Sequence, residues 1–496
     1  MTSETTLEGN LQNNDLFKNA DDEELQVEEK VFQWTKQWYP MAVVEYLDPS
    51  RPHRMQLLGK DIVLWRDGSG QWRCFEDVCP HRLVPLSEGR VEADGTLLCA
   101  YHAWRFDSQG NCVSMPQSKD EQTATKNCEN PKSCAVVYPT QERQGLLWVW
   151  AEPGEIAKVE SQLHTPRIVA ELEDNSGRVV KSAWNFRDLP YGWDYFMENV
   201  SDPAHVPVSH HGIIGDRYKD AKYYDMIPVR PISTQNGFAF EIQPTQGDTV
   251  QAIHDFQPPC YMKIVATSKD GGQLILALYA TPTRPGWCRH IGCQVFIKNP
   301  QGKKPQGLSF FGLPLPIWLT HVLASLFLHQ DMVFLHYQET IIAQRRKSKW
   351  LDAVYTPNPQ DKMVIALRRW LENRAGGGVP WAAEAISHGE QDKQKLFDVW
   401  TTHTENCTVC QNALKNINRL TVLAYVAAAV CLFIAVIVDA RFVALQAALD
   451  KSLFTLPPVG FWLALTGGIL LAVLGYQLKR FSGLFYSYTF EHAHND

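Results

Sequence analysis

The stretch Cys79-Pro80-His81 is followed, after seventeen further residues, by Cys99-Ala100-Tyr101-His102. Together the two stretches supply two thiolates and two imidazoles from two short loops. Strand-like segments at residues 62–65, 72–77 and 136–138 flank them, which places the ligands at loop tips on a small β scaffold. Structural zinc sites usually open with C-x₂₋₄-C, and the single residue between Cys79 and His81 fits that spacing poorly. The pattern therefore favours an iron–sulfur centre over zinc.

In a Rieske [2Fe-2S] centre two Cys hold one iron and two His hold the other, which lifts the reduction potential to roughly −150 to +300 mV. The two stretches resemble Rieske domains closely, including Pro80, Arg82 and the segment Trp104-Arg105-Phe106. The expected cluster ligands are Cys79, His81, Cys99 and His102. The chain is therefore expected to carry electrons.

Length and composition bound the rest of the chain. A Rieske domain uses little more than about 100 residues, whereas 496 residues suffice for two or three domains with substantial cores. The net charge of −7 argues against general nucleic-acid binding. Twelve cysteines without an N-terminal apolar signal segment indicate a reducing compartment. We expect a second domain that uses the electrons.

Six segments are expected along the chain. They are an acidic disordered tail (1–35), a Rieske domain (36–160), a catalytic mononuclear iron domain (161–400), a C-x-x-C linker (401–418), a transmembrane hairpin (419–480) and a C-terminal tail (481–496). Apolar alternation at 238–242 and 274–279 predicts strands, and residues 193–200 and 329–345 look helical. The predicted fold class is α+β: an all-β Rieske domain plus a helix-covered antiparallel-sheet catalytic domain, followed by a C-terminal two-helix transmembrane hairpin.

A second group of metal-ligating residue types lies in Asp202-Pro203-Ala204-His205 and at His210. Two His five residues apart point to different sides of a regular helix, so they can meet one ion only if the chain bends. Pro203 and Pro207 supply the breaks. Non-haem Fe(II) oxygenases bind iron through two His and one carboxylate and leave positions for substrate and O₂. His205 and His210 are therefore predicted iron ligands.

Asp331 is the predicted third ligand. It is an acid inside an otherwise apolar helix, where an unpaired charge is expensive to bury unless it coordinates a metal. Glu339 is the alternative carboxylate, and His211 could exchange roles with His210.

The pattern Asp-x-x-His-x₄-His downstream of a Rieske motif resembles the mononuclear iron site of Rieske oxygenases. The resemblance implies a homotrimer packed head to tail, in which the cluster of one chain faces the mononuclear iron of the next. It also implies that Asp202 hydrogen-bonds a His ligand on each side of that junction and takes part in catalysis. A helix N-cap is the other reading of Asp202, and both roles can hold.

The electrons are expected to come from another protein. The segment Ala375-Gly376-Gly377-Gly378-Val379-Pro380 lacks the Gly-x-Gly-x-x-Gly spacing and the preceding strand of a nucleotide loop. A ferredoxin is the expected donor. Arg82, Arg90 and Arg105 near the cluster loops could offset the acidic net charge for docking, or they could be solvated structural residues.

Two apolar runs near the C-terminus predict a membrane anchor. Leu420 to Val438 and Val459 to Leu478 have nineteen and twenty residues, and each can span about 30 Å of hydrocarbon as a helix. Basic residues outside the runs are Lys415, Arg419, Lys479 and Arg480. In the connecting segment Arg441 and Lys451 are offset by Asp439 and Asp450. The positive-inside rule then places the catalytic domains on the cytoplasmic side, or on the stromal side in a plastid.

Residues 308–328 are also apolar, but Pro314, Pro316 and His321 interrupt them. We expect this stretch to face the membrane or to line a pocket near Asp331. Just before the predicted hairpin, Cys407 and Cys410 form a C-x-x-C pair that predicts a reversible redox switch. A zinc half-site with His403 as a partner and a purely structural pair are the alternatives.

In this order, the Rieske motif, the iron-site pattern, the late C-x-x-C pair and the apolar runs resemble the pheophorbide a oxygenase family of membrane-anchored Rieske non-haem iron oxygenases. The resemblance covers nearly the whole chain after the acidic tail, including Thr281-Pro282-Thr283-Arg284-Pro285-Gly286. It implies a tetrapyrrole substrate, with O₂ used to open or hydroxylate the macrocycle. Within the family that the chain resembles, the C-x-x-C pair marks the pheophorbide branch and the branch of the chloroplast inner-envelope import subunit, and it is absent from chlorophyllide a oxygenase.

We therefore expect a ferredoxin-dependent oxygenase with a [2Fe-2S] Rieske cluster and a mononuclear non-haem Fe(II), most simply one that opens the ring of pheophorbide a. Side-chain oxygenation of chlorophyllide a or protochlorophyllide a is the alternative enzyme. A redox-sensing Rieske subunit of a membrane complex is the alternative of another class. The lack of an Arg- and Ser-rich transit peptide favours a cyanobacterial member in the thylakoid or plasma membrane.

Overall fold

The computed structural model describes residues 31–245, 247–308, 312–345, 349–382, 392–449 and 456–491. The predicted acidic tail therefore lies almost wholly outside the described residues, as do Asp450 and Lys451 of the predicted connecting segment. The chain forms two compact units. One is built from the residues before Phe397 together with the last residues of the chain, and the other is Phe397–Thr489.

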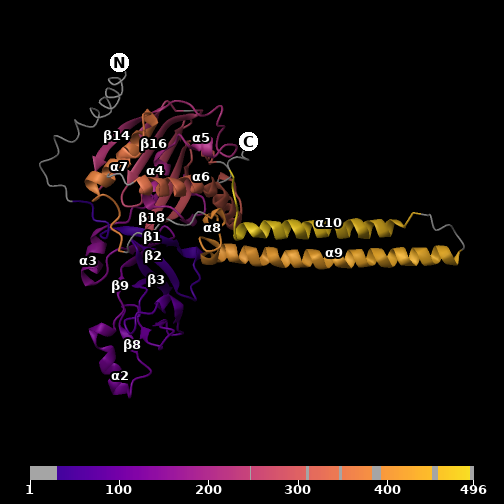
Figure 1. The fold of residues 1–496 in the computed structure, drawn as a ribbon, viewed down its shortest axis with the longest axis horizontal. Coiled ribbons are helices and arrows are strands. Elements are labelled where there is room, and N and C mark those ends of the chain that lie inside the picture. The colour runs from indigo at the N-terminus through magenta and orange to yellow at the C-terminus, as the bar shows by residue number, and fades with distance from the viewer. Residues whose placement is uncertain are drawn as a thin grey trace. The chain divides into compact units, whose positions relative to one another are not determined.

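The first part of the larger unit is all-β (Figure 1). Its three antiparallel sheets have the orders β1-β11-β10, β2-β3-β4-β9 and β5-β6-β7-β8. The strands are β1 (Trp38–Val43), β2 (His53–Leu57), β3 (Lys60–Arg66), β4 (Trp72–Glu76), β5 (Arg90–Val91), β6 (Leu97–Leu98), β7 (Arg105–Phe106), β8 (Cys112–Ser114), β9 (Val137–Tyr138), β10 (Thr140–Arg143) and β11 (Leu146–Trp150). Two short helices accompany them, α2 (Glu121–Cys128) and α3 (Glu155–Leu163). Strands β3, β4 and β9 confirm the three strands expected around the ligand loops.

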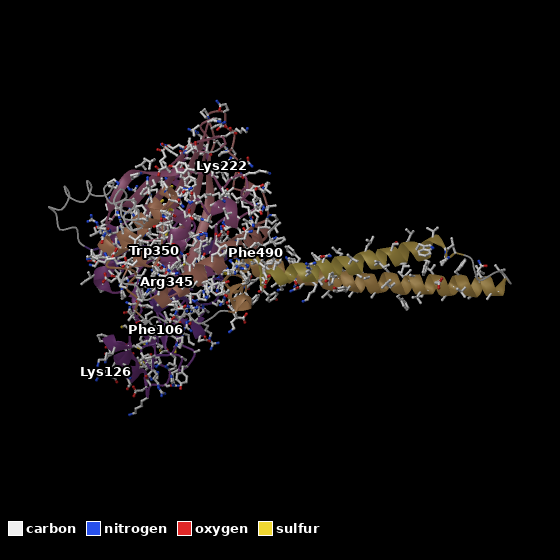
Figure 2. The ribbon with its side chains drawn as sticks, turned by 45° about the horizontal axis from the view of Figure 1, so that its top comes forward. Phe106, Lys126, Lys222, Arg345, Trp350 and Phe490 are labelled. Atoms are coloured by element: carbon white, nitrogen blue, oxygen red, sulfur yellow. The ribbon has the colours of Figure 1, made fainter. Side chains whose placement is uncertain are left out.

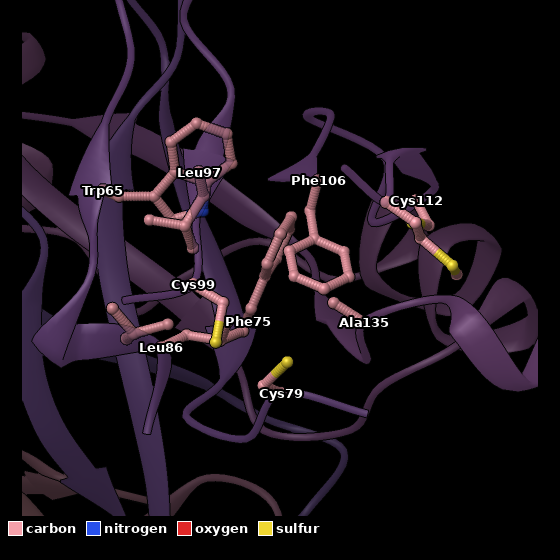
Figure 3. Close-up of a cluster of buried hydrophobic side chains, with 11 residues drawn as sticks. Trp65, Phe75, Cys79, Leu86, Leu97, Cys99, Phe106, Cys112 and Ala135 are labelled. Carbon is pink, nitrogen blue, oxygen red and sulfur yellow. The ribbon is translucent and has the colours of Figure 1, made fainter. Parts of the chain in front are cut away.

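A buried apolar cluster lies beneath the two ligand loops (Figure 3). Its fully buried side chains include Trp65, Phe75, Leu86, Leu97 and Phe106. Cys79 and Cys99 belong to the same cluster and are each 1% exposed. Each large apolar side chain contributes about 1.5–3 kcal/mol through its burial. Packing of this kind holds the two Cys-bearing loops on a fixed base.

The second part of the larger unit is a helix-covered antiparallel sheet, as predicted. The strands follow the order β12-β19-β18-β17-β16-β15-β14, and β13 also pairs with β19. They are β12 (Val179–Lys181), β13 (Asn185–Leu189), β14 (Asp225–Ser233), β15 (Gly237–Gln243), β16 (Thr249–Gln257), β17 (Tyr261–Ser268), β18 (Gln273–Arg284) and β19 (Trp287–Ile297). The helices of this part are α4 (Trp193–Ser201), α5 (Val206–Ser209), α6 (Ile317–Arg345), α7 (Lys362–Arg374) and α8 (Lys393–Leu396). Figure 2 shows Arg345 and Trp350 among these elements, and Phe106 and Lys126 in the all-β part.

Directed hydrogen bonds join the two parts of this unit. The end of β18 accepts from the turn after β2, since Leu58 N–H donates to Pro282 O at 3.0 Å and Gly59 N–H to Thr283 O at 2.7 Å. The hydroxyl of Thr281 donates to Pro40 O at 2.8 Å. The segment 281–286, which carries part of the family resemblance, therefore fastens the large sheet to the Rieske strands.

Helix α6 contains most of the apolar stretch 308–328 together with the predicted helix 329–345. It begins at Ile317, directly after Pro316, where proline is tolerated because the first turn lacks internal hydrogen-bond partners for its N–H groups. It then continues through His321 and Asp331 to Arg345. Three described helices are long and apolar enough to cross a membrane, but half of the most apolar window of α6 is buried in the protein, against 22% and 11% for the other two.

The smaller unit contains the other two apolar helices, α9 (Thr408–Ala448) and α10 (Val459–Ser482), which lie side by side in Figure 1. Glycines make their close approach possible. A Cβ added at Gly468 would lie 2.9 Å from the Leu432 side chain, and one added at Gly475 would lie 2.9 Å from the Tyr425 ring. Small residues of this kind are typical where apolar helices pack in a membrane. Both predicted apolar runs fall inside these helices.

Candidate metal centres and substrate cavity

The two ligand loops of the Rieske part have the same backbone construction. In the first, Cys79 N–H donates to Val84 O at 2.8 Å and Leu83 N–H donates back to Cys79 O at 2.9 Å. In the second, Cys99 and Trp104 make the 2.8 Å bond and Ala103 N–H donates to Cys99 O at 3.0 Å. The residue four positions after each Cys has a positive φ, 62° at Leu83 and 57° at Ala103. Non-glycine residues rarely adopt this conformation, and such positions cluster at functional sites.

The four predicted cluster ligands come together at these loops. The rings of His81 and His102 lie 4.6 Å apart, and His81 stacks on Trp104 at 4.5 Å. Figure 3 shows the sulfur atoms of Cys79 and Cys99 close to one another. A hydrogen bond from Cys79 lowers the pKa of the Cys99 thiol to about 6, whereas the same bond raises the pKa of Cys79. Two thiols that share a proton and two adjacent imidazoles fit the donor set of a Rieske cluster.

The three arginines predicted to dock a donor have different surroundings. Arg105 pairs with Asp94, and Arg90 Nε lies 3.4 Å from Glu92 Oε1. The guanidinium of Arg82 lies 5.8 Å from the centre of the Tyr101 ring. Beside it, Leu83 is 73% exposed and Tyr101 is 57% exposed. The loop tips therefore present two apolar side chains and one arginine to solvent.

The predicted mononuclear site also converges. The ligand atoms of His205, His210 and Asp331 all lie within 4.8 Å of one another. Nε2 of His210 is 3.1 Å from Asp331 Oδ2, and Nε2 of His205 is 3.7 Å from the same oxygen. His205 precedes α5 and His210 follows it, so the one-turn helix after Pro203 makes the bend that the sequence predicted. Two imidazoles and one carboxylate facing one point are the donor set of non-haem iron.

Charges at this site fit a bound cation. Burial lowers the pKa of His205, but the neighbouring carboxylates of Asp202 and Asp331 outweigh burial and hold that pKa above its usual value. Burial raises the pKa of the Asp331 carboxyl, but the two histidines hold it below its usual value. A carboxylate is therefore kept ionised opposite a positive charge. A divalent cation can take the place of that positive charge.

Polar and aromatic side chains lie behind the two histidines that are predicted ligands. Nδ1 of His205 is 3.7 Å from Asp202 Oδ2. Nδ1 of His210 lies 2.8 Å from Gln330 Oε1, and the His210 ring stacks on Phe327 at 4.0 Å. The carbonyl oxygen of Gln330 accepts the Nδ1 proton of His210, which leaves Nε2 with its lone pair toward Asp331.

Gln330 and Phe327 were not predicted from the sequence. Gln330 adjoins Asp331, but only the rotation of α6 in the folded chain shows that its amide faces His210. His211 does not join the site; its Nδ1 accepts from Arg217 N–H at 3.0 Å. Glu339 does not join it either, because its Oε2 accepts from Gly192 N–H at 2.9 Å. His210 and Asp331 are thus favoured over their alternatives.

Replacing Gln330 by Leu should weaken iron binding at the mononuclear site about 10–100-fold, because His210 loses the acceptor that fixes its tautomer. The measurement is iron retention against a competing chelator, with the cluster absorption as internal reference. Gln338→Leu makes the same change on the same helix, where the amide donates to Glu198 instead. If both variants keep iron equally well, Gln330 does not orient His210.

Glu339 should make stability depend on pH. Burial raises its pKa to about 8, and Asp194 acts in the same direction. The folded protein then holds a proton that the unfolded chain releases above its ordinary pKa of 4.5, so the free energy of unfolding falls as pH rises between these values. Glu339→Gln should flatten this dependence by up to about 4 kcal/mol in chemical denaturation at pH 5 and pH 8. Parallel pH profiles for the two proteins would rule out this role.

A cavity of about 260 Å³ opens beside the three predicted iron ligands. Its wall is mostly apolar and comes from α4, α5, α6 and the strands β16–β19. The apolar stretch 308–328 contributes to this wall through residues that include Leu308, Ala324, Phe327 and Leu328. The prediction that this stretch lines a pocket near Asp331 is therefore confirmed.

Two buried histidines, His254 and His290, line the cavity with polar, uncharged groups. Burial lowers the pKa of His254 and of His290 to about 4, so both rings are neutral near pH 7. Nδ1 of His290 lies 2.9 Å from Tyr279 O and can donate to it, which leaves Nε2 as an acceptor. Gly292 leaves room for this ring, since a Cβ there would lie 2.8 Å from His290 Cε1. Neither histidine was predicted from the sequence, because strand register alone directs them inward.

Sequence profiles of two domains match the chain: the Rieske [2Fe-2S] domain at residues 37–129 and pheophorbide a oxygenase at residues 256–349. Pheophorbide a oxygenase of Oryza sativa subsp. japonica is 33% identical to the chain over 402 residues, which cover 77% of this chain and 73% of the relative. The chain belongs to the pheophorbide a oxygenase family. As a member, it is a Rieske non-haem iron oxygenase with a [2Fe-2S] cluster and a mononuclear iron centre.

The chain is also similar to a flavonoid hydroxylase and, in fold, to a solved structure. Flavonoid 8-hydroxylase 2 of Ocimum basilicum is 31% identical over 79% of this chain and 76% of the relative. Among solved structures, NdmB of Pseudomonas putida CBB5 matches with a TM-score of 0.51 and 18% identity over 71% of this chain and 95% of that chain. This last likeness shows a shared fold.

Proposed function

We propose that this protein is a membrane-anchored, ferredoxin-dependent oxygenase that uses O₂ to open or hydroxylate a chlorophyll-derived tetrapyrrole, most simply pheophorbide a. The observation that carries the proposal is the convergence of His205, His210 and Asp331 on the wall of an apolar cavity, in a chain that also holds four Rieske ligands. Family membership supplies the substrate class. A flat apolar macrocycle matches a cavity with this lining.

The proposed iron ligands are His205, His210 and Asp331, and the proposed cluster ligands are Cys79, His81, Cys99 and His102. When bound, the two centres supply O₂ activation and one-electron transfer. Asp331 contributes a buried negative charge to the site. The Asp202 carboxylate and the Gln330 amide are proposed to hold the imidazoles of His205 and His210 in position. The apolar wall limits access of water to the reacting edge of the substrate.

The size of the cavity indicates how a macrocycle would enter. At about 260 Å³ it is smaller than the ~300–1,000 Å³ of pockets that enclose drug-sized ligands. We therefore infer that one edge of the ring enters and the remainder stays outside. Neutral His254 and His290 can accept or donate hydrogen bonds at that edge without adding charge.

Asp202 is proposed to act at a junction between copies of the chain. It lies 3.7 Å from the His205 ring, and its own side chain is 31% exposed. In a head-to-tail homotrimer its exposed oxygen could accept from a cluster histidine of the neighbouring copy. The mass of the detergent-solubilised protein by light scattering tests the trimer; a monomer with full activity would contradict it.

Ferredoxin docking is proposed at the exposed loop tips, where Arg82 lies beside Leu83 and Tyr101. An arginine among apolar side chains suits an acidic protein partner. Arg82→Glu should slow reduction of the cluster by ferredoxin but not by dithionite. Equal slowing with both reductants would contradict a docking role.

Helices α9 and α10 are proposed to form a transmembrane hairpin. Both expose apolar side chains along their length, among them Leu423, Phe433, Val436, Leu463 and Leu470. Lys415, Arg419, Lys479 and Arg480 lie at the end of the hairpin where the chain enters α9 and leaves α10, and the positive-inside rule assigns this end to the cytoplasmic or stromal side. In sealed vesicles that keep the cytoplasmic or stromal side inside, protease added outside should leave the catalytic domains intact. Digestion of these domains would reverse the sidedness.

The substrate is tested by single turnover. The protein is loaded anaerobically with reduced ferredoxin and one candidate pigment, then mixed with ¹⁸O₂, and the products are weighed by mass spectrometry. We expect ¹⁸O in ring-opened pheophorbide a. Label in a side chain of chlorophyllide a or protochlorophyllide a would select that alternative, label in a flavonoid alone would contradict the tetrapyrrole class, and no label in any compound would favour a redox-sensing subunit.

A further inference from the structure

A short segment that ends in the first turn of α9 holds three metal-ligating side chains that neither predicted iron centre uses. The segment is fastened to the residues that follow α10. Val399 N–H donates to Tyr486 O at 2.8 Å, and Thr404 Oγ1 donates to Phe485 O at 2.7 Å. The rings of Trp400 and Tyr486 stack at 5.1 Å. The backbone that carries these side chains is therefore held in place before any ligand binds.

The three side chains are His403, Cys407 and Cys410, and their ligand atoms lie within 4.8 Å of one another. Nε2 of His403 is 3.2 Å from Cys410 Sγ. In tetrahedral zinc, bonds of about 2.3 Å to sulfur and about 2.0 Å to nitrogen place the two ligand atoms about 3.5 Å apart. The observed separation needs only a small adjustment to admit a metal ion.

The burial of the two cysteines favours metal binding over thiol exchange with a partner protein. Cys407 is fully buried and Cys410 is 1% exposed, whereas a thiol that exchanges with a partner protein must be reachable. Cys407 occupies the N-cap position of α9, and the N-terminus of a helix favours a thiolate. Two thiolates buried next to one another repel each other and are costly to remove from water. A divalent cation removes that cost.

We propose that His403, Cys407 and Cys410 bind a Zn²⁺ ion at the base of α9. Binding releases the two thiol protons to solvent, and the neutral imidazole donates the Nε2 lone pair, so no oxidation is involved. Two thiolates and one imidazole are three of the four ligands that tetrahedral zinc takes, and this soft donor set selects zinc over calcium or magnesium. The ion then ties the segment before α9 to the first turn of that helix.

The test uses the full-length protein, purified in detergent without chelators and under reducing conditions. Elemental analysis should find about one zinc per chain in addition to iron. Absorption at the zinc K-edge, which the iron centres do not obscure, should report two sulfur neighbours at about 2.3 Å and nitrogen at about 2.0 Å. This measurement needs no variant and therefore no assumption about folding.

Variants then assign the ligands. Cys407→Ser, Cys410→Ser and His403→Gln should each lose zinc to background while the iron content stays unchanged. Cys431→Ser, a thiol further along α9, should keep zinc. The proposal is overturned if the native chain carries no zinc, if a Cys407–Cys410 disulfide is found by mass spectrometry after thiol labelling, or if zinc persists in the Cys407→Ser/Cys410→Ser double variant.

Discussion

Replacing Asp331 by Asn should abolish turnover and remove the mononuclear iron while leaving the Rieske cluster intact. The neutral amide is a weaker ligand, and it no longer balances the cation in a site where Asp331 is 6% exposed. Because the loss of residues that only orient ligands costs about 10–100-fold, loss of a ligand should cost more than about 100-fold in activity. Iron should fall from about three to about two per chain, with the cluster spectrum unchanged.

Glu339→Gln is the matched control for Asp331→Asn. It makes the same kind of change on the same helix, but at a carboxyl group that accepts from Gly192 N–H and does not join the site. It should keep three irons and native turnover. If Asp331→Asn also keeps its iron and activity, another residue completes the site and the proposed triad is wrong.

Asp202→Asn should keep both metal centres and lose turnover by on the order of 100-fold. Asp202 is not a proposed ligand, so the metals remain. The amide cannot accept hydrogen bonds from histidines on both sides of the proposed subunit junction as a carboxylate can, and a charge that raises the pKa of His205 is lost. Stopped-flow oxidation of the reduced cluster with substrate and O₂ measures this step.

Asp216→Asn is the control for this variant, since Asp216 is a nearby carboxylate that pairs with Lys219 at 3.2 Å. Its turnover should be native. A fully active Asp202→Asn protein would remove the junction from the mechanism. Loss of iron from that variant would instead assign Asp202 to holding the metal.

The candidate ligands could be predicted from the sequence where chemistry and spacing are local. The loops at Cys79 and Cys99 each carry their ligands within four residues, and His205 and His210 flank a proline-bent turn. Asp331 is distant in sequence, but an acid inside an apolar helix has few physical explanations, and the structure places it 3.1 Å from His210. The alternation of apolar residues likewise predicted two strands of the large sheet, β15 and β18.

Other features depend on tertiary placement. Gln330 and Phe327 reach His210 only because α6 presents that face, and His254 and His290 point into the cavity because of strand register. Helix α6 is longer than its pattern suggested, because Pro314 and Pro316 lie before the first turn and not within it. At the other end of the chain, His403 was predicted only as a partner of the Cys pair. Its 3.2 Å contact with Cys410 is what directs attention to a metal.

The most direct test of the account is a count of iron and acid-labile sulfide in the purified full-length chain, with electron paramagnetic resonance of the reduced protein. Two cooperating centres predict about three irons and about two sulfides per chain, a Rieske signal, and a separate mononuclear Fe(II) signal that appears on addition of nitric oxide. About two irons with no nitric oxide adduct would leave a Rieske protein without an oxygen-activating site. That result would contradict the proposed oxygenase.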